Sequence, residues 1–374
     1  MNSRERVKKT LNHQQPDKIP IDLGGFTSTI EAEPYEELKN YLELKNIGPT
    51  LITTRTHVAP DEVILDKFEV DTRYLRPFPL QRWGDIKKQK YIIDGWGIKW
   101  QRLENSHYFD PIFAPLSNYT YEDLKYYTYP DLWVNNFENE LSKRAESLYK
   151  NTDYYLIADI LSLGIFETSW ALRGMENFLV DLMINKAFAN KLLDIILEQR
   201  KEYFRKFLDI VGPFIDMVMV TDDLATQDSL MMSPELYREM IKPRHYELNT
   251  FIKSKYNVKI FHHSCGAIRS LIDDLIDTGV DVLNPIQVTA KGMDTKKLKE
   301  DFGEKIVFWG GGCDTQKVLP FGTAEEIRIE VKKRISDLKS GGGFVFSQVH
   351  EIQPGTPPEN IVKMYESVKE FRDY

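Results

Sequence analysis

"NVKIFHHSCGAIRSLIDDLIDTGVDVLNPIQ", residues 257–287, contains the repeating unit that decides the fold. Its apolar and β-branched opening, residues 257–263, predicts a buried strand, and the spacing of the apolar residues from Ile268 to Leu275 predicts an amphipathic helix. Gly279 is a residue type that commonly ends a helix, and residues 280–287 predict another strand. A strand, a helix and a second strand in this order predict a βαβ unit with two parallel strands.

The same alternation continues on both sides of this stretch. Further buried strands are predicted at 17–25, 154–160, 214–223, 305–316 and 342–354. Continuous apolar strands that alternate with helices indicate a parallel sheet that is covered on both faces. An open doubly wound sheet and a closed barrel both fit, but no GxGxxG follows the first strand. The number of units and the polar residues at the strand ends therefore favour a (β/α)8 TIM barrel.

The whole chain, residues 1–374, is expected to form a single domain. Residues 26–150 follow the alternation poorly and are rich in Tyr, Trp and Pro. We therefore expect aromatic-rich insertions in this N-terminal half, packed over the mouth of the barrel.

Three helix starts carry capping signals. Ser233 precedes a helical pattern and is expected to be its N-cap. Thr323 with Glu326, and Thr356 with Glu359, have the spacing of a capping box.

The composition excludes several classes of protein. A net charge of -8 argues against nucleic-acid binding, which usually needs a basic face. No apolar run approaches the length of a membrane span, and the first residues lack the apolar core of a signal peptide. Two cysteines in a chain of 374 residues do not form a disulfide framework, so a cytoplasmic location is expected.

Polar residues follow most of the predicted strands. In a barrel, side chains just past the carboxyl ends of the strands converge on the face where catalysis takes place. Both cysteines and three of the seven histidines fall in this set. The residues expected on this face are Asp22, Asp159, Asp222, Asp223, His262, His263, Cys265, Asn284, Gln287, Cys313, Asp314, Gln348 and His350.

His263 and Cys265 form a His-x-Cys pair, and Cys313 and His350 follow at later strand ends. Thiolate and imidazole are ligands that zinc prefers, and a zinc site with an open position is catalytic. The pair alone also fits a hydrogen-bonded turn histidine beside a small buried thiol. The two later residues favour a zinc site, with His263, Cys265, Cys313 and His350 as candidate ligands.

Other readings of these residues stay open. Cys313 lies in a glycine-rich strand end where a small side chain is needed, and His350 can bind substrate without a metal. His262 precedes His263 on the strand and is expected to face the opposite side. Asp222 and Asp223 either cap the next helix or anchor the rim of the barrel, or they bind substrate or orient a ligand histidine.

Four further segments are distinctive. They are "SRERVKKTLNHQQPDKIPI" (3–21), "LGIFETSWALRGMENFLVDL" (163–182), "GGGCDTQKVLPFGTAEEI" (310–327) and "VHEIQPGTPPENI" (349–361). Through these segments the chain resembles the uroporphyrinogen decarboxylase superfamily along most of its length. The resemblance implies a (β/α)8 barrel, in agreement with the strand–helix alternation.

The resemblance implies one of two chemistries. The decarboxylases are metal-free and hold a polycarboxylate porphyrinogen through an arginine-rich N-terminal motif, where this chain reads "IDLGGFTST" (21–29). In the cobamide-dependent methyltransferases, a His-x-Cys pair and a later cysteine hold zinc. His263 and Cys265 match that pair, and His350 stands in place of the later cysteine. Either His350 or Cys313 is then the third ligand.

The methyltransferase branch is favoured by the His-x-Cys pair. It implies a zinc-dependent enzyme that moves a methyl group between a small methylated substrate and a separate corrinoid (cobalamin) protein, with zinc acting as a Lewis acid. The corrinoid is expected from a partner, because the chain lacks the Asp-x-His-x-x-Gly signature of cobalamin-binding domains. The aromatic residues suit an aryl methyl ether and hence O-demethylation; they are Trp83, Trp96, Trp100, Tyr108 and Phe109.

Site roles follow from this interpretation. The expected catalytic residues are His263, Cys265, His350 and Asp222. The expected substrate-binding residues are Asp22, Asp223, Asn284, Gln287 and Gln348.

Three alternative functions stay open. The first is transfer from a methyl-corrinoid to a thiol such as coenzyme M, where zinc lowers the pKa of the thiol. The second is a metal-free decarboxylase that uses His350 and Asp22. The third is a zinc-binding or corrinoid-docking module without turnover, which would have a closed four-ligand site. The oligomeric state, including a homodimer, is also left open.

Overall fold

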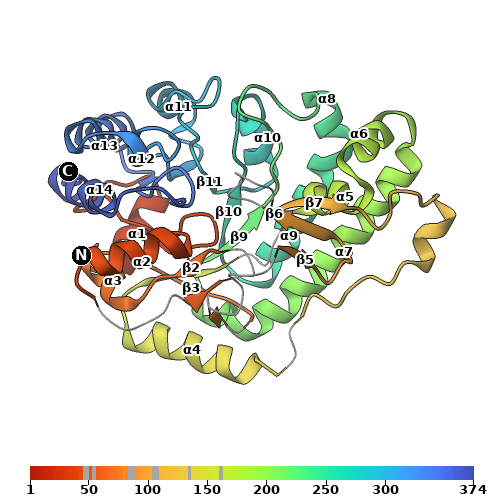
Figure 1. Cartoon of the computed structure of the whole chain (residues 1–374), viewed down its shortest axis with the longest axis horizontal. Helices are drawn as coiled ribbons and strands as arrows, with labels where there is room; N and C mark the ends of the chain where they lie inside the picture. The colour runs from red at the N-terminus through yellow and green to blue at the C-terminus, as the bar shows by residue number, and fades with distance from the viewer. Residues whose placement is uncertain are drawn as a thin grey trace.

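The computed structural model describes residues 1–44, 50–52, 56–78, 80–82, 90–102, 109–133, 136–159 and 163–374. Its main feature is a curled sheet of seven parallel strands with helices around it (Figure 1). The strands are β3 (Thr72–Leu75), β8 (Tyr155–Ala158), β9 (Met217–Thr221), β10 (Lys259–His263), β11 (Val282–Asn284), β12 (Val307–Trp309) and β13 (Phe344–Val345). Their order is β13-β12-β11-β10-β9-β8-β3, so neighbours in the chain are neighbours in the sheet. The predicted α/β class is confirmed.

The βαβ unit predicted from residues 257–287 is present. Strands β10 and β11 pair in parallel, with Phe261 opposite Val282 and His263 opposite Asn284. The helix between them is short: a 3₁₀ turn (Arg269–Leu271) leads into α10 (Ile272–Asp277), and Gly279 follows with a φ of +86°. A positive φ is easily adopted by glycine, which explains the turn toward β11.

The helices cover the outer side of the curled sheet, as Figure 1 shows. They are α1 (Ser3–Leu11), α2 (Ala32–Tyr41), α3 (Glu62–Lys67), α4 (Glu138–Asn151), α5 (Ile165–Arg173), α6 (Met175–Ile184), α7 (Lys186–Val211), α8 (Pro234–Leu236), α9 (Lys242–Lys255), α11 (Thr295–Phe302), α12 (Val318–Phe321), α13 (Ala324–Leu338) and α14 (Pro358–Phe371), in addition to α10. In the part of the chain that the structure describes, none of these helices has the length and apolar character needed to cross a membrane.

Two of the three predicted helix caps are confirmed. The Ser233 hydroxyl accepts from a backbone N–H of α8, and Thr323 forms a capping box with Glu326. The predicted box at Thr356 is wrong, since Pro357 is the N-cap of α14 and no side chain caps it. A residue before proline is restricted to extended conformations, so Pro358 places the start of the helix after Pro357.

Residues 26–150 are more than insertions. Strand β3 lies in this range and belongs to the main sheet, which the sequence analysis missed. Two small antiparallel sheets also lie here, in the orders β2-β1-β4 and β5-β6-β7. Their strands are β1 (Thr50–Leu51), β2 (Val58–Ala59), β4 (Gln81–Arg82), β5 (Tyr91–Ile93), β6 (Lys99–Arg102) and β7 (Phe109–Phe113).

The predicted strand at 17–25 is reduced to a short bridge. Ile21 pairs in parallel with Phe346, just after β13, and its carbonyl accepts from the N–H of Asp71, just before β3. Residues 20–22 therefore contact both edges of the seven-stranded sheet.

The alternation of side chains along the strands separates two hydrophobic clusters. The inner one takes residues from every strand of the main sheet, including Tyr74, Phe261, Trp309 and Val345. The larger one lies between the sheet and the helices. Because side chains two residues apart share a face of a strand, His263 lies on the inner side with Phe261, and His262 faces the helices.

Candidate metal centre

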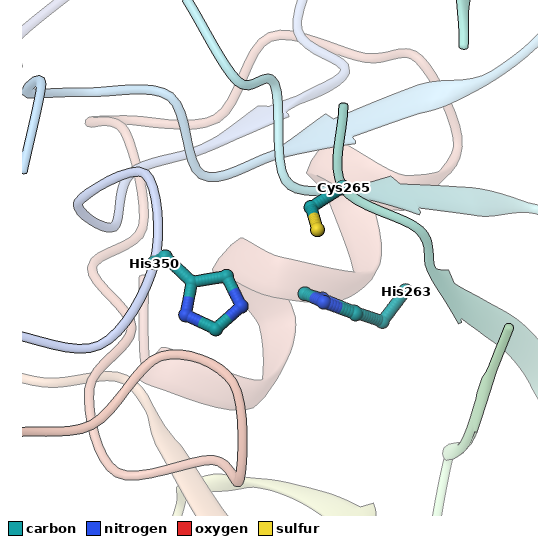
Figure 2. Close-up of side chains that lie close together, drawn as sticks. All are labelled: His263, Cys265 and His350. Atoms are coloured by element: carbon teal, nitrogen blue, oxygen red, sulfur yellow. The ribbon is translucent and has the colours of Figure 1, made fainter. Parts of the chain in front are cut away.

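His263, Cys265 and His350 meet at the carboxyl end of the sheet. His263 is the last residue of β10, Cys265 lies in the turn that follows, and His350 lies in the segment after β13. One nitrogen of each histidine and the Cys265 sulfur all lie within 4.8 Å of one another. Figure 2 shows the three side chains pointing toward one another. The structure therefore brings together three of the four expected zinc ligands.

Asn284 determines which nitrogen of His263 is available. The Asn284 amide nitrogen donates to the carbonyl of Trp309 at 2.9 Å, so its side-chain oxygen faces His263. His263 Nδ1 lies 2.6 Å from that oxygen and must be the donor. The lone pair then resides on Nε2, the nitrogen that a metal would use, and this is how ligand histidines are usually oriented.

The Cys265 thiol is held by Asp223. Its sulfur donates to one Asp223 oxygen at 3.2 Å, and its backbone N–H donates to the other at 2.8 Å. Burial, together with the nearby Asp223 carboxylate, raises the pKa of the Cys265 thiol well above its usual range. The thiol is therefore protonated in the metal-free protein, and a bound cation is what would favour the thiolate.

Gly266 allows the sharp turn that presents Cys265. Its φ is +93°, and a Cβ at this position would lie 2.6 Å from the carbonyl oxygen of Thr226. The Gly266 N–H donates to the Gln287 side chain at 2.7 Å. The backbone conformation of this turn therefore explains the glycine in the sequence HSCG.

His350 lies against its chain neighbour Glu351. Nδ1 of His350 contacts Oε2 of Glu351, and the rings of His350 and His263 meet edge to face with centroids 5.2 Å apart. Burial, followed by the nearby His263 and His57, holds the pKa of His350 well below its ordinary value. The imidazole is neutral at physiological pH, which a metal ligand requires.

A cavity of about 440 Å³ opens beside the three side chains, all of which line it. Other lining residues are Phe26, His57, Glu167, Asp223, Gln287 and Glu351. Among the described lining residues there is no lysine or arginine. Three protein donors next to such a space leave room for a fourth ligand, as in catalytic zinc sites.

Cys313 is not part of this group. Its side chain is fully buried in the larger hydrophobic cluster, and its sulfur is not among the ligand atoms that come together. Strand β12 ends at Trp309, and Gly310 and Gly311 follow with φ of +87° and +81°. The chain therefore turns sharply between the end of β12 and Cys313, so a place after a strand end does not bring this side chain to the cavity.

Asp222 also lies elsewhere than expected. Its oxygens accept from the N–H groups of Phe166 and Glu167 in the first turn of α5, both at 2.8 Å. One oxygen also lies 2.9 Å from His245 Nε2, and the residue is fully buried. Asp222 therefore anchors the start of α5, which precedes it in the chain and is not the next helix that the sequence suggested, and it is not among the residues that line the cavity.

Asp22 and Gln348, expected to bind substrate, are enclosed away from the cavity wall. The Asp22 carboxylate accepts four side-chain hydrogen bonds, from Ser28, Thr72, Tyr74 and Trp309.

The Gln348 side chain is likewise used internally. Its nitrogen donates to the carbonyls of Ser28 and Thr29. Of the remaining expected substrate-binding residues, Asp223 and Gln287 line the cavity, and Asn284 acts through His263.

The described members of the aromatic wall expected from the N-terminal half do not line this cavity. Trp96 and Trp100 are buried in the larger hydrophobic cluster, and Phe109 packs against it. Trp83 and Tyr108 lie outside the described residues. Phe26, which the sequence analysis did not single out, lines the cavity instead.

Three acidic or basic residues of the cavity wall were missed: His57, Glu167 and Glu351. Glu167 carried a signal, because Gly164-x-x-Glu167 is a helix-start pattern, and the Gly164 N–H does donate to its carboxyl group. Burial, followed by repulsion from Asp223 and Asp222, raises the pKa of Glu167 well above its usual range. A protonated Glu167 is therefore expected at neutral pH.

Comparisons with known proteins agree with this architecture. The family model described as "Uroporphyrinogen decarboxylase (URO-D)" matches residues 164–371, more than half of the chain. A solved structure of a methyltransferase from Methanosarcina mazei is 19% identical, aligns over 99% of both chains with a TM-score of 0.67, and shares the fold.

Two curated relatives carry names of two different activities. The methylcobamide:CoM methyltransferase MtaA of Methanosarcina barkeri is 25% identical over 216 residues, covering 58% of this chain and 55% of the relative. The uroporphyrinogen decarboxylase of Chlorobium luteolum is 26% identical over 200 residues, covering 50% and 53%. The chain thus spans about half the length of these curated relatives. The residues matched by the family model include His263, Cys265 and His350. The chain therefore belongs to the uroporphyrinogen decarboxylase family and is similar to its cobamide-dependent methyltransferase branch.

Proposed function

We propose that this protein is a zinc-dependent methyltransferase that moves a methyl group between a small methylated substrate and a separate corrinoid protein. The observation that carries the proposal is the convergence of the Cys265 sulfur and two imidazole nitrogens beside the cavity. A decarboxylase without a metal has no need for a thiol in that position.

The donor set fits zinc. One sulfur and two nitrogens are ligands that zinc prefers, and the Asn284 hydrogen bond presents the correct nitrogen of His263. We propose His263, Cys265 and His350 as the protein ligands, with the fourth position facing the cavity. Cys313 is not proposed as a ligand, because its sulfur lies in the hydrophobic core.

Zinc, when bound, supplies a Lewis acid that polarises the heteroatom carrying the methyl group, or lowers the pKa of a thiol acceptor. The chain's own residues perform the remaining tasks. Asp223 contacts the Cys265 sulfur and is the nearest acceptor for the thiol proton. Glu167 is a carboxyl group on the cavity wall whose pKa is raised by burial, and its role would be to donate a proton to a heteroatom after methyl transfer.

The substrate is proposed to be small and methylated, and the corrinoid is proposed to come from a partner protein. An aryl methyl ether would stack on Phe26, the aromatic residue at the cavity in the described part of the chain. The similarity to a methylcobamide:CoM methyltransferase favours a second version, in which a thiol is the methyl acceptor.

We also propose that the curled sheet closes into the (β/α)8 barrel. Residues 20–22 contact Phe346 beyond β13 and Asp71 before β3, which are the two open edges of the sheet. Closure would place the carboxyl ends of all strands around the cavity, where active sites of such barrels lie.

Metal analysis together with a methyl-transfer assay tests the proposal. The reduced, chelator-free protein should carry a zinc ion with a sulfur ligand, and Cys265→Ala should lose that ion together with methyl transfer to a corrinoid protein. Methyl ethers, methylamines and methylated thiols would be screened as donors, and free thiols as acceptors. If the protein holds no zinc under these conditions, the methyltransferase mechanism is wrong.

A metal-free decarboxylase is the second candidate, because a decarboxylase relative matches the chain as well as MtaA does. A substrate with several carboxylates needs cationic groups, and the described lining residues supply none. Decarboxylation of a porphyrinogen by the zinc-free protein would favour this candidate.

A further inference from the structure

A second cluster of potential metal ligands lies against the first. Glu31, His57 and Glu351 each offer one ligand atom, and these three atoms all lie within 4.8 Å of one another. All three side chains are buried, with Glu351 only 1% exposed. None of them belongs to the group of His263, Cys265 and His350.

The backbone fixes the positions of these three residues. Glu31 pairs with His57 in an antiparallel bridge, and Ile30 pairs with Ile352 in a parallel one. The Glu31 N–H donates to the Ile352 carbonyl at 2.9 Å. Three distant segments are thus tied into one small ladder, which gives the site the rigidity that metal binding requires.

The distances between the donors suit an ion better than a direct hydrogen bond. His57 Nε2 and Glu351 Oε1 are 3.8 Å apart, which is beyond hydrogen-bond range. Two ligands bound at about 2.1 Å to one ion with tetrahedral or octahedral angles lie roughly 3 to 3.5 Å apart, so only a small adjustment is needed.

Each carboxylate keeps an oxygen for the cluster. One Glu31 oxygen accepts from the Thr56 hydroxyl at 2.5 Å, and no other described residue hydrogen-bonds to the Glu31 carboxylate. Oε2 of Glu351 is buried without a hydrogen bond among the described residues and touches Nδ1 of His350, while Oε1 faces His57.

An ion can reach the cluster from the cavity, and a positive charge would be stabilised there. His57 and Glu351 line the cavity of about 440 Å³. Two buried carboxyl groups this close together repel one another when both are ionised, and a divalent cation between them would offset that repulsion.

We propose that Glu31, His57 and Glu351 bind a second divalent cation, beside the zinc site formed by His263, Cys265 and His350. Two carboxylates and one imidazole suit zinc, manganese or ferrous iron, whereas the thiolate site is selective for softer ions. The two sites share no ligand, so the second stands independently of the proposed methyl transfer. Glu351 connects them, because it contacts His350 as well.

Metal counting tests the proposal. The full-length protein is loaded with excess zinc, freed of unbound metal by gel filtration, and analysed by plasma mass spectrometry. Wild type should hold two zinc ions per chain, and Glu31→Gln and His57→Gln should each hold one. Cys265→Ala should also hold one, and the combination of Cys265→Ala with Glu31→Gln should hold none. Glu33→Gln, the loss of an exposed carboxylate two residues away, is the matched control and should hold two.

X-ray absorption at the zinc edge identifies which ion is lost. The average number of sulfur ligands per zinc should be about one half in wild type, rise to one in Glu31→Gln, and fall to zero in Cys265→Ala. Circular dichroism and thermal unfolding report whether each variant is folded. If Glu31→Gln does not fold, the zinc content of His57→Gln tests the second site.

The outcomes separate the two proposals. One zinc in wild type that only Cys265→Ala removes would overturn the second site and leave the proposed function intact. Two zinc ions that persist in both Glu31→Gln and His57→Gln would also overturn it. Zinc retained in Cys265→Ala but lost in Glu31→Gln would support the second site alone and contradict the first.

Discussion

The two clusters at the cavity are neighbours, yet they are built in different ways. His263 and Cys265 stand at the end of β10, and His350 follows β13, so parallel strands deliver the first cluster. The second depends on bridges between three segments, around residues 31, 57 and 351, that lie outside the main sheet. The first cluster lies at the carboxyl ends of parallel strands, where active sites of α/β barrels lie, whereas the second lies among loop segments.

Their chemistry differs as well. In the metal-free protein the first cluster is neutral, because burial raises the pKa of the Cys265 thiol and lowers those of His263 and His350. In the second, burial raises the pKa of Glu31 to about 7, opposed by the hydrogen bond from Thr56. The comparison teaches that neighbouring segments can bring a soft, sulfur-containing set of side chains and a harder carboxylate set within contact distance of one another.

The largest expected effect concerns the third ligand of the first cluster. His350→Ala should lower zinc affinity at the thiolate site by at least about a hundredfold, because it removes one of three protein ligands. Cys313→Ala removes the other sequence-based candidate and should leave the affinity unchanged. Competition titration with a chromophoric chelator measures both, and the reverse result would make Cys313 the ligand.

Zinc removal should lower the stability of the fold. Free zinc at one hundred times the dissociation constant stabilises the folded state by about 2.7 kcal/mol. Chelation should therefore lower the midpoint of thermal unfolding, and added zinc should restore it. In Cys265→Ala, added zinc should raise the midpoint of thermal unfolding by less than in wild type, because the first cluster no longer binds zinc. An identical zinc-dependent shift in Cys265→Ala would place all of the stabilising metal elsewhere.

Orienting hydrogen bonds are expected to come next in size. Asn284→Ala removes the acceptor that fixes His263 and should weaken zinc binding about 10- to 100-fold. Asn249→Ala is the control, since Asn249 is also buried but donates to Thr278 in another part of the molecule. Equal zinc affinity in the two variants would show that the His263 contact does not tune the metal.

The smallest expected effect belongs to the second cluster. Thr56→Val removes the hydroxyl that donates to Glu31 and should cost about 1 kcal/mol, or roughly a fivefold loss of affinity for the second ion. The thiolate site should be unaffected. Isothermal titration with zinc and with manganese resolves the two sites, and a change confined to the thiolate site would contradict the assignment.

Much of the fold was predictable from the sequence. Continuous apolar strands and cap signals such as Ser233 are local, and each reports on a few neighbouring residues. Strand β3 was missed because "TRYL" is short and polar for a buried strand, and its burial comes from the neighbouring strands and helices. The prediction of a capping box at Thr356 was wrong for a local reason, because Pro357 and Pro358 follow it and move the start of the helix.

The site shows where local signals end. The sequence alone determined the fold class, the placement of His263 and Cys265 at a strand end, and the opposite facing of His262, since strand geometry fixes all three. Only the tertiary structure placed His350, and not Cys313, beside His263 and Cys265, used Asp222 at the start of α5, and brought Glu31 and His57 beside Glu351. These outcomes depend on contacts between residues far apart in the chain, and such contacts are set by packing of the whole molecule, which no local pattern encodes.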